Sequence, residues 1–298
     1  MKIHSRDVKI KGWLPRIAHI DGDKYTFPQD PEEFVSDLRK YGSRIDLFSF
    51  LQKLPETSPK YDYPFEWDNL AVLPVSTFDC WWQHQLRSYA RNRARQAEKK
   101  GVKFREVPFG DALLQGICEV YNETPIRQGK RFPHYGMTLE SARAYAGTFP
   151  DRSVYLGAFL EDRMIGFIKL VTDETRTHAC IVHILSMVQH RDKAPTNGLI
   201  AEAVRFCASR QISYLVYENF SYGKREGDTL SHFKEVNGFQ RMDLPRYYIP
   251  LNFVGKVALK LGLHRPLIDR VPETWLAKFR ELRAAWYGRR FQTAKVVS

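Results

Sequence analysis

Side chains that can transfer protons or hold charge gather in the second half of the chain. His183 lies within an aliphatic run, and an imidazole of ordinary pKa can accept a proton near neutral pH. The competing interpretation is a histidine that packs in the core and has no catalytic role. Glu218 is an alternative base. Tyr222 and Lys224 follow the end of an expected strand, where a phenol can donate a proton and an ammonium can hold an anion, and a plain loop is the competing interpretation.

A second concentration of polar chemistry lies between Thr124 and Gly136. This segment combines cations with aromatic rings in a density that is unusual for a surface loop. Its strongest candidates for binding a ligand are Arg127, Lys130, Arg131, His134 and Tyr135.

The positive charge of the chain is concentrated in two segments. The net charge is +12 over 298 residues, and the segment from Arg87 to Arg105 and the segment from Phe253 to Ser298 carry most of the excess of lysine and arginine. Such segments favour polyanionic partners: the phosphates of a donor molecule, tRNA, a nucleotide-linked sugar or an anionic membrane surface. Solvated basic helix faces explain the same pattern. Pro272 and the stripe Trp275, Phe279, Leu282 and Trp286 predict a basic amphipathic helix over 272–290, which either contacts an anionic membrane or docks on the body of the protein.

The cysteines and the N-terminal segment exclude several classes of protein. Cys80, Cys118, Cys180 and Cys207 form no CxxC pair, so we expect neither a metal site nor a disulfide framework. No run approaches the ~20 apolar residues of a membrane span, and the first residues lack the apolar centre of a signal peptide. We therefore expect a cytoplasmic protein, with a peripheral position at the inner membrane surface as an option that the basic tail leaves open.

A strand–helix–strand unit positions these candidates. Residues 179–188 are apolar on both faces of a strand, Thr196 can cap a helix, and 212–217 returns as a strand after a crossover long enough for parallel pairing. Runs at 154–160 and 164–171 flank a short turn and predict a hairpin that leads into this unit.

The remaining elements are expected from patterning and capping signals. Ser76 with Asp79 resembles a capping box and predicts one helix that ends near Gly101. The other predicted elements are helices at 31–40, 111–121 and 141–148, strands at 45–51, 70–75 and 102–107, and an extended loop over 53–68.

Several short motifs in this order resemble the FemAB-like branch of the GNAT superfamily, which includes peptidoglycan-bridge aminoacyltransferases. They are "AEKKGV" after an arginine-rich helix, "GFIKL" in the hairpin, and "FKEVNGF" with "YYIPL" near the end, and the similarity covers about 77–251. The resemblance implies an α/β (α+β) fold with a mixed, splayed sheet flanked by helices. Residues 1–76 would form an N-terminal extension or partial GNAT-like subdomain, and 252–298 a basic helical tail.

The resemblance also implies a site. The sheet would splay between the strands at 179–188 and 212–217 to admit an acyl donor, and Phe233-Lys234 matches a family position whose lysine stabilises negative charge. A solvated helix lysine is the competing interpretation of Lys234. The loop at 124–136 would lie beside the acceptor entrance, with Lys224 as a further acceptor contact. The implied donor-binding residues are Gln189, Arg191, Lys193, Thr196, Asn197, Gly198 and Phe233.

One departure leaves the donor undecided between acyl-CoA and aminoacyl-tRNA. GNAT proteins that bind acetyl-CoA usually have glycine in the loop that meets pyrophosphate, whereas this chain has Asp192 there and Pro195 after it. The sequence therefore predicts a GNAT-type transferase that moves an acyl or aminoacyl group, without a metal, to an amine of a small-molecule or cell-envelope-type acceptor. The alternative is a noncatalytic RNA- or membrane-binding protein on a degenerate GNAT scaffold.

Overall fold

The computed structural model describes residues 1–41, 45–127, 130–221 and 229–265. The chain forms two compact units. The first contains Met1–Gln85, Val171–Val182 and the described part of Phe206–Pro266, and the second contains Leu86–Leu170 and His183–Arg205. This division differs from the consecutive ranges 1–76, 77–251 and 252–298 expected from the sequence, which stay a prediction. The helix predicted over 272–290 lies outside the described residues.

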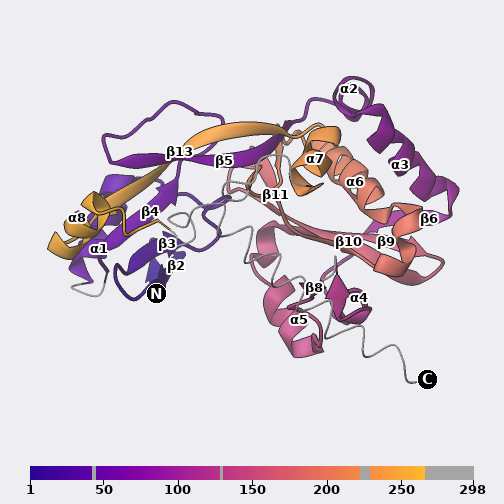
Figure 1. The fold of residues 1–298 in the computed structure, drawn as a ribbon, viewed down its shortest axis with the longest axis horizontal. Coiled ribbons are helices and arrows are strands. Elements are labelled where there is room, and N and C mark those ends of the chain that lie inside the picture. The colour runs from indigo at the N-terminus through magenta and orange to yellow at the C-terminus, as the bar shows by residue number, and fades with distance from the viewer. Residues whose placement is uncertain (42–44, 128–129, 222–228, 266–298) are drawn as a thin grey trace. The chain divides into compact units, whose positions relative to one another are not determined.

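The first unit is built on a mixed sheet. Its strands follow the order β1 (Lys2–Ile3), β2 (Arg6–Lys11), β3 (Ile17–Ile20), β4 (Leu47–Leu51), β13 (Gln240–Pro250), β5 (Phe65–Pro74), β12 (Tyr214–Val216) and β11 (His178–Ser186). β3 and β4 pair in parallel, as do β11 and β12, whereas β13 is antiparallel to both β4 and β5. Figure 1 shows the long β13 beside β5 and β4.

Two helices belong to the outer part of this sheet. α1 (Pro31–Lys40) begins after Asp30, whose carboxylate accepts hydrogen bonds from the first-turn amides, and Pro31 suits the first helical position. Its Phe34 ring stacks on Phe48 of β4, with 5.1 Å between ring centroids. α8 (Phe253–Lys260) follows β13, and Asn252 caps its start.

The predicted strand–helix–strand unit is confirmed. β11 is followed by a 3-10 helix over Val188–Lys193, by α6 (Pro195–Ser209) and then by β12. The parallel ladder joins only His178–Cys180 to Tyr214–Val216, after which β12 ends and β11 continues to Ser186. The amide of Tyr217 donates to Ala71 of β5, so the residue after β12 pairs away from β11.

In the second unit, the strand order continues from β11 through β10 (Arg163–Thr172) and β9 (Ser153–Leu160) to β6 (Val102–Glu106). Figure 1 shows α3 (Ser88–Lys99) and α6 on one side of these strands, and α4 (Asp111–Asn122) and α5 (Leu139–Ala146) on the other. The predicted hairpin and the helices near 111–121 and 141–148 are therefore confirmed. The segment expected as a loop contains two short antiparallel strands, β7 (Ile126–Arg127) and β8 (Lys130–Arg131).

Three expectations about local structure are wrong. The helix expected from Ser76 to Gly101 is divided into α2 (Phe78–Cys80), a π-helix over Trp81–Gln85 and α3, because the backbone is extended at Arg87. Thr77 caps α2 in place of Ser76. β5 begins at Phe65, inside the expected loop, because residues 65–68 pair with β13.

Two further features concern binding. Within the described ranges, no helix is long and apolar enough to cross a membrane. The same part of the chain holds no group of three or more His, Cys, Asp or Glu side chains arranged to bind a metal ion.

Candidate functional site

Lys234 is the candidate whose environment differs most from that of a surface lysine. It lies on the buried face of α7 (Thr229–Val236) and is fully buried. Its ammonium donates a hydrogen bond to the Asn219 carbonyl and lies 4.9 Å from the centroid of the Tyr217 ring. Both contacts are of a kind that an ammonium group makes. The alternative of a solvated helix lysine is therefore wrong.

α7 docks on the segment that follows β12. Ser231, one turn before Lys234, donates to the Phe220 carbonyl at 3.0 Å, so two side chains on one helix face bind neighbouring carbonyls of this segment. The helix ends at Val236, and Gly238 shortly after it adopts a left-handed φ of +90°. These contacts hold the Lys234 ammonium beside the segment that follows β12.

A chain of charged groups extends from the same strand end. Glu218 has a left-handed φ of +51°, a strained conformation for this residue type, and its carboxylate pairs with Lys24. The Lys24 ammonium also donates to the side-chain oxygen of Asn219 at 2.7 Å. The side-chain nitrogen of Asn219 in turn donates to the Asp68 carboxylate at 2.7 Å.

Arg246 closes this network. Its guanidinium binds Asp23 at 2.6 Å and Asp68 at 2.8 Å. Burial alone would lower the pKa of Arg246, but the two carboxylates raise it above its usual value. Acidic and basic side chains therefore alternate along this network, and they also bind the side chain of Asn219.

In the second unit, the loop expected to bind the donor is already bound by a carboxylate of the protein, that of Glu123. The backbone amides of Val188 and Gln189 donate to the two carboxylate oxygens of Glu123 at 2.8 and 2.7 Å. Arg127 binds the same carboxylate at 3.3 Å. Two of the backbone donors that could face a pyrophosphate are therefore taken by a side chain of the protein itself.

Side chains of α3 hold the rest of this loop. Arg93 donates to the Arg191 carbonyl at 2.9 Å, and Gln96 donates to the Asp192 carbonyl at 2.7 Å. Lys100 pairs with the Asp192 carboxylate at 2.8 Å and, through this hydrogen bond first of all, lowers its pKa. Lys193 is a weaker partner at 3.5 Å. The negative charge of Asp192 is thus offset mainly by Lys100.

The start of α6 has structural explanations for residues expected to bind the donor. The hydroxyls of Thr196 and Ser186 are 2.7 Å apart, and the amide of Asn197 donates to Ala194. A Cβ on Gly198 would lie 2.0 Å from the Phe104 ring, so close packing between α6 and β6 requires glycine there.

Arg127 ties its own segment to the end of β11. Its guanidinium donates to the carbonyls of Ser186 at 2.8 Å and Val120 at 3.0 Å. Burial is the main cause that lowers its pKa. These contacts occupy the guanidinium inside the protein, whereas Lys130, Arg131 and Tyr135 are exposed and can meet a ligand.

His183 lies in an aromatic group in the second unit. Its ring stacks on Tyr145 with 4.1 Å between centroids, and Tyr145 also contacts His134 at 5.4 Å. Burial and the nearby charge of Lys169 lower the pKa of His183 to about 4. The imidazole is therefore neutral at pH 7 and is a weaker proton acceptor than its ordinary pKa suggested.

The sequence did not single out Lys169 and Glu123, although both make buried or partly buried contacts in the second unit. Lys169 is fully buried in β10 and donates 2.7 Å hydrogen bonds to the Ala146 carbonyl and to Thr148, and burial lowers its pKa to about 8. A lysine inside the apolar run "GFIKL" was the available signal. For Glu123, the signal was Arg127 at i+4 after a predicted helix.

The structure divides the candidates between the two units. Lys234, Phe233 and Glu218 belong to the first, where Phe233 is half-buried in α7. Tyr222 and Lys224 lie outside the described residues. The second unit contains the other candidates: Arg127, Lys130, Arg131, His134, Tyr135, His183, Gln189, Arg191, Lys193, Thr196, Asn197 and Gly198.

Comparison with known proteins supplies a fold. No family model and no curated protein matches the chain in sequence. Among solved structures, L-PGS from Bacillus licheniformis has a TM-score of 0.56 at 14% identity, covering 82% of this chain and 81% of that one. The C-terminal domain of a putative lysylphosphatidylglycerol synthetase from Agrobacterium fabrum gives 0.54 at 15% identity, with 85% and 83% covered. FemX gives 0.54 at 11% identity, with 80% and 83% covered.

These similarities confirm the predicted fold. The chain shares the fold of FemX and of the two synthetase structures, which is built here on a mixed sheet flanked by helices. At these identities the likeness concerns the fold alone, and activity must be argued from the site.

Proposed function

We propose that this protein is an acyltransferase that moves an acyl or aminoacyl group from an activated donor to an amine of a small-molecule or cell-envelope-type acceptor. The observation that carries the proposal is Lys234, whose ammonium is fully buried at the end of β12, where the parallel ladder with β11 stops after three residue pairs. The fold supports it as well, because two of the similar structures are an L-PGS and a putative lysylphosphatidylglycerol synthetase.

In the proposed reaction, the acceptor amine attacks the carbonyl carbon of the donor. A C–N bond forms, the C–O or C–S bond to the donor breaks, and the carbonyl oxygen carries negative charge in between. Lys234 stabilises that charge together with strand amides, so catalysis depends on positioning and electrostatics. Glu218 or water accepts the amine proton, and Tyr222 returns a proton to the leaving group.

The Glu123 contacts support an aminoacyl-tRNA donor over acyl-CoA. A pyrophosphate at the 188–193 loop would compete with a carboxylate that already holds two amides and Arg127. A tRNA ester needs no pyrophosphate site there, and the basic surface of α3 suits an RNA backbone. Within the second unit, Lys130, Arg131, His134 and Tyr135 are the candidates for contacts with the acceptor.

The experiment compares label transfer from radiolabelled aminoacyl-tRNAs and acyl-CoAs to aminated acceptors, including phospholipid vesicles and amino-sugar nucleotides. Lys234→Met should lower the rate by about 10²-fold or more, the usual effect of removing one oxyanion donor. Trp81→Phe is the matched control. It removes a 2.9 Å hydrogen bond from the indole to Asn237, just after α7, but keeps the ammonium. Equal rates for Lys234→Met and wild type would refute the catalytic role.

The alternative function is a noncatalytic RNA- or membrane-binding protein on the same scaffold. The occupied loop amides and the net charge of +12 favour it. Salt-sensitive binding to tRNA or anionic vesicles, with no transfer from either donor class, would select this alternative.

A further inference from the structure

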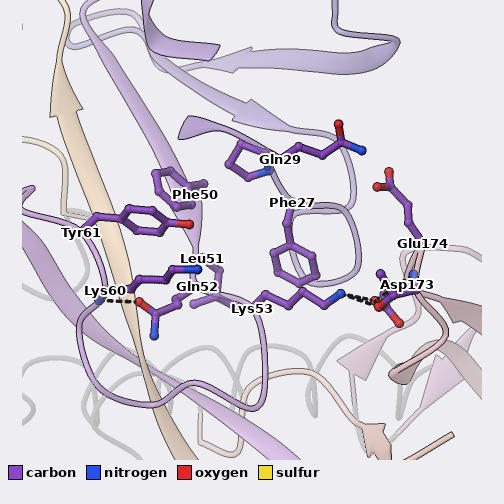
Figure 2. A pocket seen from close by; sticks show the side chains of 12 residues that line it. Phe27, Gln29, Phe50, Leu51, Gln52, Lys53, Lys60, Tyr61, Asp173 and Glu174 are labelled. Carbon is purple, nitrogen blue, oxygen red and sulfur yellow. Dashed lines mark hydrogen bonds and ion pairs between the residues drawn. The ribbon is translucent and has the colours of Figure 1, made fainter. Parts of the chain in front are cut away.

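The first unit contains a pocket that the proposed reaction does not use. It has a volume of about 430 Å³, within the range of small-molecule sites. Figure 2 shows its walls: Phe50 and Tyr61 on one side, Phe27 facing them, and Lys53 with Asp173 at one end. All of these residues belong to the same compact unit.

One wall of the pocket is held by several partly buried hydrogen bonds. The Tyr247 hydroxyl accepts the amides of Lys60 and Tyr61 at 2.8 and 3.2 Å. The side chain of Gln52 donates to the carbonyls of Glu56 and Ser58 and accepts from the Lys60 amide. These bonds use only the backbone of Lys60, so its ammonium is left to face the pocket.

The acids of the pocket already have partners. The Asp173 carboxylate binds Lys53 at 2.8 Å, Thr175 and the His178 amide. Glu174 binds Arg6 at 2.6 Å. Among the described residues, no acid lies within ion-pair distance of Lys60. This lysine is exposed, and its ammonium is 5.7 Å from the centroid of the Tyr61 ring. The charge that remains for a ligand is therefore positive.

We propose that this pocket binds a small molecule that carries a planar ring and one anionic group, a carboxylate or a phosphate. The ring lies between the side chains of Phe27 and Tyr61, and the anion pairs with Lys60. Figure 2 shows the Lys60 ammonium and the Tyr61 hydroxyl on the same side of the cavity.

The test measures dissociation constants of benzoate, phenyl phosphate and neutral benzyl alcohol for the full-length protein by ligand-observed NMR. At least one of the two anions should bind about fivefold more tightly than benzyl alcohol, and the tighter one identifies carboxylate or phosphate. Lys60→Met should weaken that anion about fivefold, as expected for a solvent-accessible ion pair. Lys256→Met is the control, an exposed lysine on α8 of the same unit, and should leave binding unchanged.

Phe27→Leu provides a second arm, because loss of the facing ring should weaken all three probes. Equal affinity for the anions and benzyl alcohol, an unchanged constant in Lys60→Met, or no binding of either anion would overturn the proposal. Circular dichroism of each variant verifies folding. Acyl transfer by the same preparations is a separate readout, so the pocket and the proposed function can fail independently.

Discussion

Replacement of Glu123 by alanine tests how the 188–193 loop is held. The carboxylate accepts hydrogen bonds from two backbone amides and pairs with Arg127, and its side chain is only 9% exposed. Each hydrogen bond to a charged group contributes about 1.5–3 kcal/mol, and the substitution removes the charged acceptor from both the Val188 and the Gln189 amide. The expected loss is about 3–5 kcal/mol in the free energy of unfolding.

Glu119→Ala is the matched control. Glu119 belongs to α4, which ends just before Glu123, and its ion pair with Arg163 at 3.2 Å joins side chains that are 42% and 56% exposed. Such exposed pairs contribute about 0–1 kcal/mol. Urea unfolding of both variants gives the free energies, and amide hydrogen exchange at Val188 and Gln189 reports the loop directly. A loss below about 1 kcal/mol in Glu123→Ala, with unchanged exchange, would refute the reasoning.

Three further substitutions test packing and charge. Gly198→Ala should lower the free energy of unfolding by about 1–3 kcal/mol, because the new Cβ would collide with the Phe104 ring. Adding Phe104→Leu should restore part of this loss in thermal unfolding, and the absence of any rescue would contradict a packing role. The folded pKa of His183 is about 4 and its ordinary value 6.5, so its contribution of about 3 kcal/mol is present above pH 6.5 and is lost as the pH falls through 4. His183→Phe should therefore flatten the pH dependence of the unfolding free energy between pH 7 and 4, and an unchanged slope would contradict the lowered pKa. Arg246→Met leaves Asp23 and Asp68 without their shared cation and should cost about 3–5 kcal/mol in urea unfolding, whereas a cost below 1 kcal/mol would show that the network contributes little.

Much of the fold could be predicted because local patterns and global packing agree. The apolar run at 179–188, the helix signal at Thr196 and the return at 212–217 correspond to β11, α6 and β12. Where prediction failed, long-range contacts decided the local structure. Residues 65–68 extend β5 only because β13, far along the chain, supplies the pairing partner.

The candidate site was predictable in part. Lys234 was named from a family motif, and its burial could not be read from the sequence because it depends on carbonyls of the segment after β12. Glu123 was not considered as a ligand of the 188–193 loop, because its partners lie some 65 residues away in the chain. The lowered pKa of His183 likewise depends on burial and on Lys169, which only the folded chain brings near it.

The most direct test of the central claim is photocrosslinking with an aminoacyl-tRNA analogue that carries a diazirine on its aminoacyl group. If the activated carbonyl binds at the end of β12, mass spectrometry should find the label on the peptide that contains Tyr217–Asn219 or on the peptide that contains Lys234. An excess of unlabelled aminoacyl-tRNA should suppress this label, and uncharged tRNA should suppress it less. Label confined to other peptides, or equal suppression by both tRNAs, would contradict the account.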